Sequence, residues 1–248
     1  MSNPKVLSNT RLKSGAFSLV LEWPEAGNIR PGTFLHVKCG EERLLRRPIS
    51  ICETEHDRLR MIFEVRGEGT KWLSECKAGD CLDVLGPLGN GFDVGNGRVI
   101  VAGGGIGVPP MLGAARAAGG RATAVAGFRS EGNVMLEEEL RSVCEDVSVT
   151  TDDGTYGEHG AVTLPLSRLL AVGGYDKVLA CGPKAMLRAV AEICATHETG
   201  CYVSLEERMG CGIGACLVCA CNTIENGEVQ MRRVCKDGPV FDAREVVW

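Results

Sequence analysis

Hydrophobic and polar residues alternate along the first part of the chain. The stretch 59–65 places Leu, Met, Phe and Val at every second position, with mostly charged residues between them. This is the two-residue period of a half-buried strand. Similar stretches at 17–23 and 33–39 are separated by a proline–glycine turn. Short strands with turns between them predict an antiparallel β-barrel over residues 1–96.

Beyond residue 97 the pattern changes to apolar strand-like stretches that alternate with amphipathic helix-like stretches. The expected strands cover 98–102, 122–128, 147–151 and 177–181, and the expected helices cover 111–118, 134–144 and 184–196. Such alternation predicts a parallel sheet with right-handed crossovers over residues 97–199. Ligands of these sheets bind beyond the C-terminal ends of the strands.

The last segment, 200–248, contains regularly spaced cysteines. Cys211, Cys216 and Cys219 follow a C-x4-C-x2-C pattern, and Cys235 follows after fifteen intervening residues, beyond a predicted hairpin with its turn at Asn226-Gly227. This is the ligand spacing of a plant-type [2Fe–2S] cluster. A structural zinc site is an alternative, although zinc ribbons usually show two close cysteine pairs. Ordinary buried thiols are another.

Two stretches of the predicted barrel are candidates for phosphate binding. Arg46 and Arg47 precede Pro48-Ile49-Ser50, and a guanidinium forms paired hydrogen bonds with phosphate, but a pair of solvated surface charges explains the two arginines equally well. Further along, Gly67, Gly69 and Thr70 begin a helix, whose N-terminus favours an anion. A glycine turn with a threonine cap is the alternative for this second stretch.

Glycines follow the first strand of the predicted parallel sheet. Gly103, Gly104, Gly105 and Gly107 match the dinucleotide-binding fingerprint only in part, because Val108 stands where the third glycine is required. A tight strand-to-helix turn is the alternative. About twenty positions on, Arg129 favours a 2′-phosphate and Glu131 a free ribose, so NAD and NADP both remain open. Two further loops follow strand ends and contain Asp152 and Cys181-Gly182.

Composition narrows the class of protein. The chain has 248 residues, 44% of them hydrophobic, and a net charge of −5 without a long basic run, which argues against nucleic acid as a partner. The apolar tract 99–118 is interrupted by glycines and prolines, so we expect no membrane span. The polar N-terminal sequence does not resemble a secretory signal. Thirteen cysteines therefore indicate a reducing compartment, the cytoplasm.

The other cysteines and the histidines carry no ligand pattern. We expect Cys221 to be a buried bystander of the cluster. His36, His56, His159 and His197 are expected to be solvated or to have hydrogen-bond partners. The remaining cysteines are expected to be core thiols, and they are Cys39, Cys52, Cys76, Cys81, Cys144, Cys194 and Cys201.

Taken in order, these motifs resemble the ferredoxin–NAD(P) reductase superfamily. The quoted stretches are Arg47-Pro-Ile-Ser50, Gly67-Glu-Gly-Thr70, Gly103-Gly-Gly-Ile-Gly107, Thr151-Asp-Asp-Gly154 and Cys181-Gly-Pro183. The ending, from Leu205 through the cluster cysteines to Phe241, is more specific and resembles the electron-transfer subunits of type B dihydroorotate dehydrogenases.

The resemblance implies a multidomain protein with an FAD-binding barrel, an NAD-binding α/β domain and a small [2Fe–2S] domain. It implies that Arg47, Pro48, Ile49 and Ser50 contact the flavin and its phosphates, although the superfamily often has an aromatic residue where Ile49 stands. By the same resemblance Gly67, Gly69 and Thr70 hold the pyrophosphate. Gly103, Gly104, Gly105, Gly107, Asp152 and Gly182 are the expected NAD-binding residues. Ser50 and Cys181 are the expected catalytic residues.

The implied function is an electron relay in pyrimidine biosynthesis. Its partner is an FMN-containing catalytic subunit that oxidises dihydroorotate, in a heterotetramer of two copies of each, with NAD(H) as the other substrate. Three alternatives remain at this point. One is a ferredoxin or polysulfide reductase subunit that uses NAD(P)H, another is an iron–sulfur redox sensor, and the third is a zinc module on a nucleotide-binding scaffold.

Overall fold

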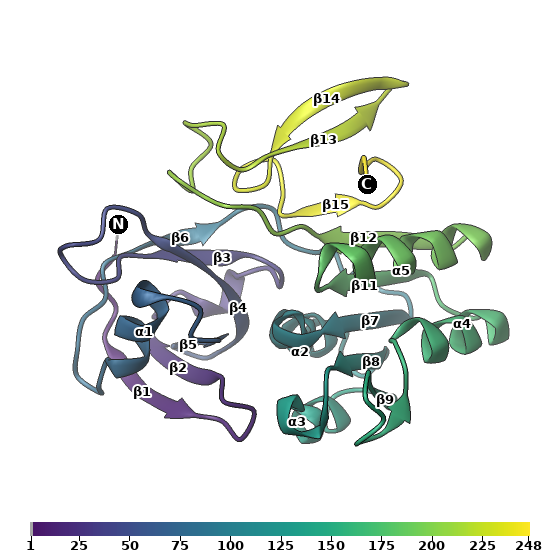
Figure 1. Ribbon diagram of the computed structural model, residues 1–248, viewed down its shortest axis with the longest axis horizontal. Coiled ribbons are helices and arrows are strands. Elements are labelled where there is room, and N and C mark those ends of the chain that lie inside the picture. The colour runs from purple at the N-terminus through teal and green to yellow at the C-terminus, as the bar shows by residue number, and fades with distance from the viewer. Residues whose placement is uncertain (1) are drawn as a thin grey trace.

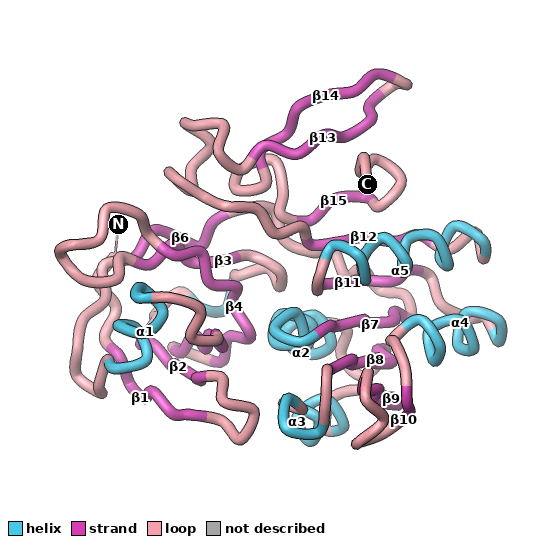
Figure 2. The backbone as a smooth tube through the Cα atoms, in the orientation of Figure 1, coloured by secondary structure: helices cyan, strands magenta, loops and turns pink. Residues whose placement is uncertain are grey.

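The computed structural model describes residues 2–248, and its first unit is the predicted barrel (Figures 1 and 2). Six antiparallel strands lie in the order β1-β2-β5-β4-β3-β6. Bridges from Ser2 to Val84 and from Lys5 to Cys81 connect the two edges. The elements are β1 Val6–Arg11, β2 Phe17–Glu22, η1 Ala26–Asn28, β3 Phe34–Val37, β4 Arg47–Glu55, β5 Arg58–Phe63, α1 Glu68–Glu75 and β6 Val84–Leu88. The prediction of an antiparallel barrel is confirmed.

The alternation of apolar and polar residues reflects which strand side chains face the core of the barrel. In the β2–β5 pair, Leu19 lies opposite Met61 and Leu21 lies opposite Leu59, and all four side chains are fully buried. Because successive strand residues point to opposite faces, Arg60 between them reaches outward to Glu53, at 2.9 Å. The barrel thus has its own core.

The second unit is a seven-stranded sheet in the order β10-β9-β8-β7-β11-β12-β15, parallel except for its last strand. Helices α2 and α3 lie on the side of the barrel, while α4 and α5 cover the opposite face (Figure 1). Its strands are β7 Val99–Gly104, β8 Ala122–Phe128, β9 Asp146–Thr151, β10 Glu158–His159, β11 Lys177–Cys181, β12 Gly200–Ser204 and β15 Val240–Asp242. Its helices are η2 Gly105–Gly107, α2 Val108–Ala117, η3 Glu131–Asn133, α3 Glu137–Arg141, α4 Thr163–Val172 and α5 Lys184–Thr196.

Two expectations for this unit need correction. The helix expected over 134–144 is only the short α3, because Leu136 takes a left-handed conformation (φ 61°) that buries its side chain and separates α3 from η3. Helix α4 was not expected. Its Pro165 lies in the first turn, where proline is compatible with a helix, but a proline there obscures the pattern in the sequence.

The parallel sheet continues across the predicted boundary at 199/200. Strand β12 pairs in parallel with β11, and β15 returns to pair with β12. Buried Cys201 and Val203 of β12 pack in the same core as α5, which places this strand in the sheet. The cluster segment, here residues 205–239, is therefore an insertion between β12 and β15. The division into three domains stays a prediction.

The cluster segment contains the predicted hairpin. Strands β13 Ala220–Glu225 and β14 Glu228–Arg233 pair around a turn in which Asn226 and Gly227 both have positive φ. The hairpin projects beyond the sheet at the top of the view (Figure 1). It returns the chain so that Cys235 lies beside the loop of the first three cysteines. Within residues 2–248, no helix has both the length and the apolar composition needed to cross a bilayer.

Candidate functional site

The four spaced cysteines lie together as two pairs. The Sγ atoms of Cys211 and Cys216 are 3.4 Å apart. Cys219 and Cys235 are almost fully buried, and their thiols interact with each other. A [2Fe–2S] cluster has four thiolates for two irons, so a pairwise arrangement fits it. Zinc instead needs its ligands around one point.

Backbone N–H groups point at the sulfurs. Gly214 donates to Cys235 Sγ at 3.2 Å, and Cys216 donates to Cys211 Sγ at 3.3 Å. Burial alone raises the pKa of Cys211, but backbone donors of the loop outweigh it and lower that pKa to about 6. Burial and the neighbouring Cys219 thiol raise the pKa of Cys235 to about 12. A loop that already stabilises one thiolate fits an anionic cluster, because each ligand must be deprotonated to bind metal.

Side chains on both sides of Cys235 hold the loop in place. Arg233 donates to the backbone oxygen of Gly214 at 3.2 Å and to Asp237 at 3.0 Å. This ion pair lowers the pKa of Asp237. From the barrel side, Asn90 donates to the backbone oxygens of Lys236 and Asp237, at 3.0 and 3.1 Å. The cluster segment is thus anchored to the barrel as well as to the sheet.

The structure separates the roles of the two arginines in the barrel. Arg46 forms paired hydrogen bonds with Asp83 at 2.7 and 2.8 Å and also donates to the Asp83 backbone oxygen. Arg47 instead lies over the start of α1, where a Cβ at Gly69 would come within 2.7 Å of its Nε. Arg46 is therefore structural. Arg47 and the N-terminus of α1 together form a positively polarised site that can bind phosphate.

The side chains of Thr70 and Ile49, both expected to contact the cofactor, also have contacts within the protein. The Thr70 hydroxyl accepts hydrogen bonds from the backbone N–H groups of Arg66 and Gly67, so it caps its own helix, as in the alternative interpretation. The side chain of Ile49 packs in the barrel core, so only its backbone could contact a ligand. Pro48 and Ser50, on the same strand, are partly exposed.

The glycine loop and the Cys181-Gly182 loop lie directly against each other. Strand pairing places Cys181 beside Gly103. A Cβ at Gly107 would collide with the Cys181 backbone, and one at Gly182 would lie 2.8 Å from the sulfur of Met186. Gly103 and Gly104 are similarly enclosed, whereas Gly105, with φ +52°, faces open space. Close packing explains three of the four glycines, and Gly105 leaves backbone accessible to a ligand.

Cys181 has a neutral thiol. Burial raises the pKa of Cys181 to about 12, against a hydrogen bond with Ser204 that lowers it. It therefore cannot act as a thiolate nucleophile near neutral pH. A small, uncharged side chain at the C-terminal end of β11 is instead suited to lie beside an aromatic ring.

Asp152 is exposed at the end of β9, and strand β8 separates it from the glycine loop. The loop after β8 is fixed to the same region, since the backbone N–H of Glu131 donates to the Thr155 hydroxyl at 2.8 Å. The structure therefore brings Asp152 near the candidate ribose residues Arg129 and Glu131 rather than near Cys181.

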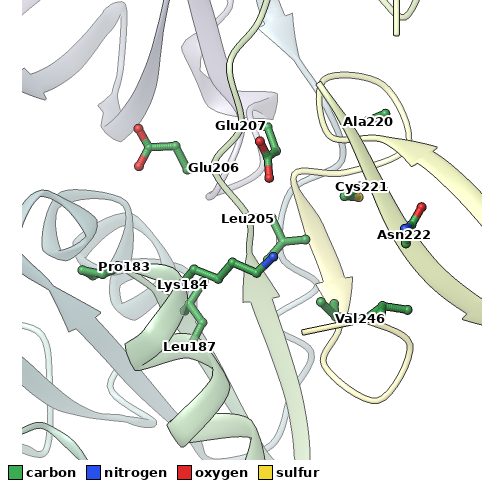
Figure 3. Close-up of a pocket in the computed structure, with 12 residues that line it drawn as sticks. Pro183, Lys184, Leu187, Leu205, Glu206, Glu207, Ala220, Cys221, Asn222 and Val246 are labelled. Atoms are coloured by element: carbon green, nitrogen blue, oxygen red, sulfur yellow. The ribbon is translucent and has the colours of Figure 1, made fainter. Parts of the chain in front are cut away.

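A cavity of about 320 Å³ lies where the sheet meets the cluster segment. Figure 3 shows Lys184 extending across it toward Leu205, with Cys221 on the hairpin side. Glu206 and Glu207, on the segment that leaves β12, also line it. Cys221 is partly exposed here rather than buried as expected.

Two other expectations from the sequence are wrong. Cys81 is exposed, not a core thiol. His36 is fully buried, and neither of its ring nitrogens has a hydrogen-bond partner within the described chain. Burial and then the charge of Arg46 lower its pKa. No signal in the sequence marks His36, because its surroundings come from distant segments.

Similarity to a solved structure first defines the class of fold. A solved structure described as an NADH-dependent reduced ferredoxin-NADP oxidoreductase, studied for flavin-based electron bifurcation, superposes with a TM-score of 0.89 and is 29% identical. It covers all of this chain, which in turn covers 91% of it. The fold is therefore that of the ferredoxin reductases.

Residues 206–247 match the family model for the iron–sulfur cluster binding domain of dihydroorotate dehydrogenase B. A curated relative from Caldanaerobacter subterraneus subsp. tengcongensis, the electron transfer subunit of dihydroorotate dehydrogenase B (NAD(+)), is 42% identical over 98% of this chain and 97% of its own length. The corresponding subunit from Geobacillus kaustophilus is 44% identical over 88% of this chain and 87% of its own. The chain belongs to the family of dihydroorotate dehydrogenase B electron transfer subunits.

Proposed function

We propose that this chain passes electrons between NAD(H) and a dihydroorotate-oxidising partner subunit by way of FAD and a [2Fe–2S] cluster. The observation that carries the proposal is the meeting of three sites. Cys181 ends β11, the adjacent β12 continues into the cluster loop, and Gly212 of that loop packs against His36 of the barrel. These contacts bring the end of β11, the barrel and the cluster loop near one another, which supports a nicotinamide site, a flavin site and a cluster that lie close together.

The order of the carriers follows from electron number. Nicotinamide exchanges a hydride, a cluster accepts one electron, and a flavin can do both. The flavin therefore belongs between the other two. In this arrangement the chain's own residues bind and orient, and no side chain needs to form a covalent bond.

Each group of residues has a proposed role. Arg47 and the N-terminal backbone of α1, with Gly67 and Gly69, bind the FAD phosphates, while Pro48, Ser50 and the Ile49 backbone contact the flavin. The second group, Gly103–Gly107 with Gly182, holds the nicotinamide dinucleotide, and Asp152 contributes near its ribose. Cys181 lines the nicotinamide pocket with its neutral thiol. Cys211, Cys216, Cys219 and Cys235 bind the cluster.

Exposed apolar side chains on the cluster segment support docking of the partner. Ile213, Leu217 and Val218 of the loop are each more than half exposed, as are Val229 and Met231 of β14. Clustered exposed apolar side chains mark interaction sites. We propose that the FMN-containing catalytic subunit covers this surface, in a complex with two copies of each subunit.

The free state of all thirteen cysteines supports the proposal that the complex works in a reducing compartment, the cytoplasm.

The test is reconstitution with a dihydroorotate-oxidising flavoprotein. Adding dihydroorotate and NAD+ to the purified complex should produce NADH. A Cys219→Ser variant should lose this activity and its cluster absorption. It should still oxidise NADH with an artificial acceptor that takes electrons directly from the flavin. Cys81→Ser, at an exposed thiol outside the loop, is the matched control and should keep both. Absence of NADH formation by a complex that contains flavin and iron would count against the proposal.

A further inference from the structure

His36 is a buried polar side chain without a partner. It lies in β3, opposite Pro48 of β4 and Leu85 of β6, and its imidazole is fully enclosed. Neither ring nitrogen forms a hydrogen bond with any described residue. Buried polar groups are rarely left in this state, and an exception indicates a functional role or an additional ligand.

The ring faces the cluster loop. A Cβ at Gly212 would collide with Nδ1 of His36 and would lie 2.9 Å from its Cε1. Gly212 has φ +72°, so both its conformation and its missing side chain allow the close approach. The backbone carbonyls of Arg46 and Cys211 also lie near the ring and favour its protonated form, but neither meets a ring nitrogen with the geometry of a hydrogen bond. His36 is thus a residue of the barrel that contacts the loop between two cluster ligands.

The charged neighbours of His36 offer its ring no acceptor. Arg46 is a donor only, and its guanidinium is held by Asp83 and by the backbone oxygen of His36 itself. Arg47 is likewise a donor. An imidazole carries at least one N–H in either protonation state, and no described acceptor meets that N–H with hydrogen-bond geometry.

We propose that His36 is a positioning residue that donates a ring N–H hydrogen bond to the sulfur cage of the [2Fe–2S] cluster on the Cys211 side. The loop supplies backbone donors from Gly214 and Cys216, and His36 supplies a donor from the barrel. Such a bond stabilises the reduced cluster more than the oxidised one, because reduction adds negative charge, and hydrogen bonds to the sulfurs set the reduction potential. The inference rests on the proposed function.

The first test compares His36→Leu with His36→Gln in the full-length protein, by EPR-monitored redox titration of the cluster. Leucine removes both ring nitrogens, whereas glutamine keeps an N–H. We expect His36→Leu to make cluster reduction about fivefold less favourable, which is ~40 mV toward negative potential at 59 mV per tenfold for one electron. His36→Gln should recover at least half of that shift.

A matched control separates loosened packing from a lost hydrogen bond. Leu35→Val trims the neighbouring, fully buried residue of β3, and it should leave the potential unchanged. The inference is overturned if His36→Leu retains its cluster at the wild-type potential, or if Leu35→Val shifts the potential as much.

A second measurement needs no variant. Pulsed EPR of the reduced wild-type protein, labelled with 15N-histidine, should detect weak coupling to one histidine nitrogen. Absence of coupling overturns the inference even if His36→Leu fails to fold. A wild-type protein without any cluster EPR signal would instead refute the proposed function, so the two failures are distinguishable.

Discussion

The backbone N–H of Gly214 donates a 3.2 Å hydrogen bond to the Sγ of Cys235, twenty-one residues further along the chain. Only glycine suits this position. Its φ of +81° is a left-handed conformation, and the side chain of Lys236 packs where the Cβ of another residue would lie. This contact connects the cysteine loop to the strand that returns from the hairpin. It joins the loop that carries the first three cysteines to the fourth cysteine.

Replacing Gly214 with alanine should therefore reduce cluster occupancy. A Cβ there would lie 2.5 Å from Cδ of Lys236, and the left-handed backbone adds strain of about 1–2 kcal/mol. We expect the ratio of iron to flavin to fall by half or more, measured by metal analysis and visible absorption. Gly227→Ala is the matched control, since Gly227 has φ +83° but no neighbour within 4 Å. Equal iron loss in both variants would contradict the role of Gly214.

The cluster segment was the part of the molecule most fully predicted from sequence. Ligand spacing and the Asn226-Gly227 turn are local signals. The hairpin turn is confirmed, and the structure brings the spaced cysteines together in pairs, while their role as ligands stays a prediction. Arg46 and Arg47 could not be separated in the same way. Their difference depends on Asp83, thirty-seven residues beyond Arg46, which binds one guanidinium and not the other.

Long-range contacts also explain what the sequence did not show. His36 has its neighbours in β4, β6 and the cluster loop, so no local pattern could mark it as unpartnered. Strand β12 was assigned to the cluster segment because its pairing with β11 and β15 is invisible without the fold. The assignment of FAD- and NAD-binding residues stays a prediction.

The two barrel arginines should respond oppositely to substitution. Arg46→Ala leaves Asp83 unpaired in a partly buried place and should lower the free energy of unfolding by about 1–2 kcal/mol, with flavin affinity nearly unchanged. Arg47→Ala should weaken FAD binding by about tenfold or more, since hydrogen bonds to charged groups contribute about 1.5–3 kcal/mol. Denaturant unfolding of the apoprotein and FAD titration measure the two quantities. The assignment fails if Arg46→Ala is the variant that loses FAD.

Buried thiols should make the protein less stable at high pH. Burial raises the pKa of Cys39, Cys76 and Cys144 to about 11 and that of Cys181 to about 12, from about 9 in the unfolded chain. Between about pH 9 and 12 the unfolded state therefore binds fewer protons than the folded state. The free energy of unfolding must then fall as pH rises, whereas below pH 9 these groups contribute no slope.

Denaturant titrations between pH 7 and 10.5 measure this slope. Cys144→Ala should make the fall above pH 9 shallower, because burial is the only cause of the raised pKa at that position. Cys81→Ala, at the exposed thiol, should leave the slope unchanged. Identical slopes in wild type and Cys144→Ala would show that this thiol ionises as readily in the folded protein as in the unfolded chain.

The apolar surface around the cluster can be tested by placing a charge on it. Leu217 is 62% exposed between two cluster ligands, so Leu217→Glu should fold normally but leave a carboxylate to be desolvated in the complex. We expect affinity for the catalytic subunit to fall by at least about tenfold, or ~1.4 kcal/mol, measured by titration calorimetry. The cluster spectrum and NADH oxidation with an artificial acceptor should be retained. Val172→Glu, at an 88% exposed position at the end of α4, is the control and should bind like wild type. Unchanged affinity of Leu217→Glu would mean that the partner docks elsewhere.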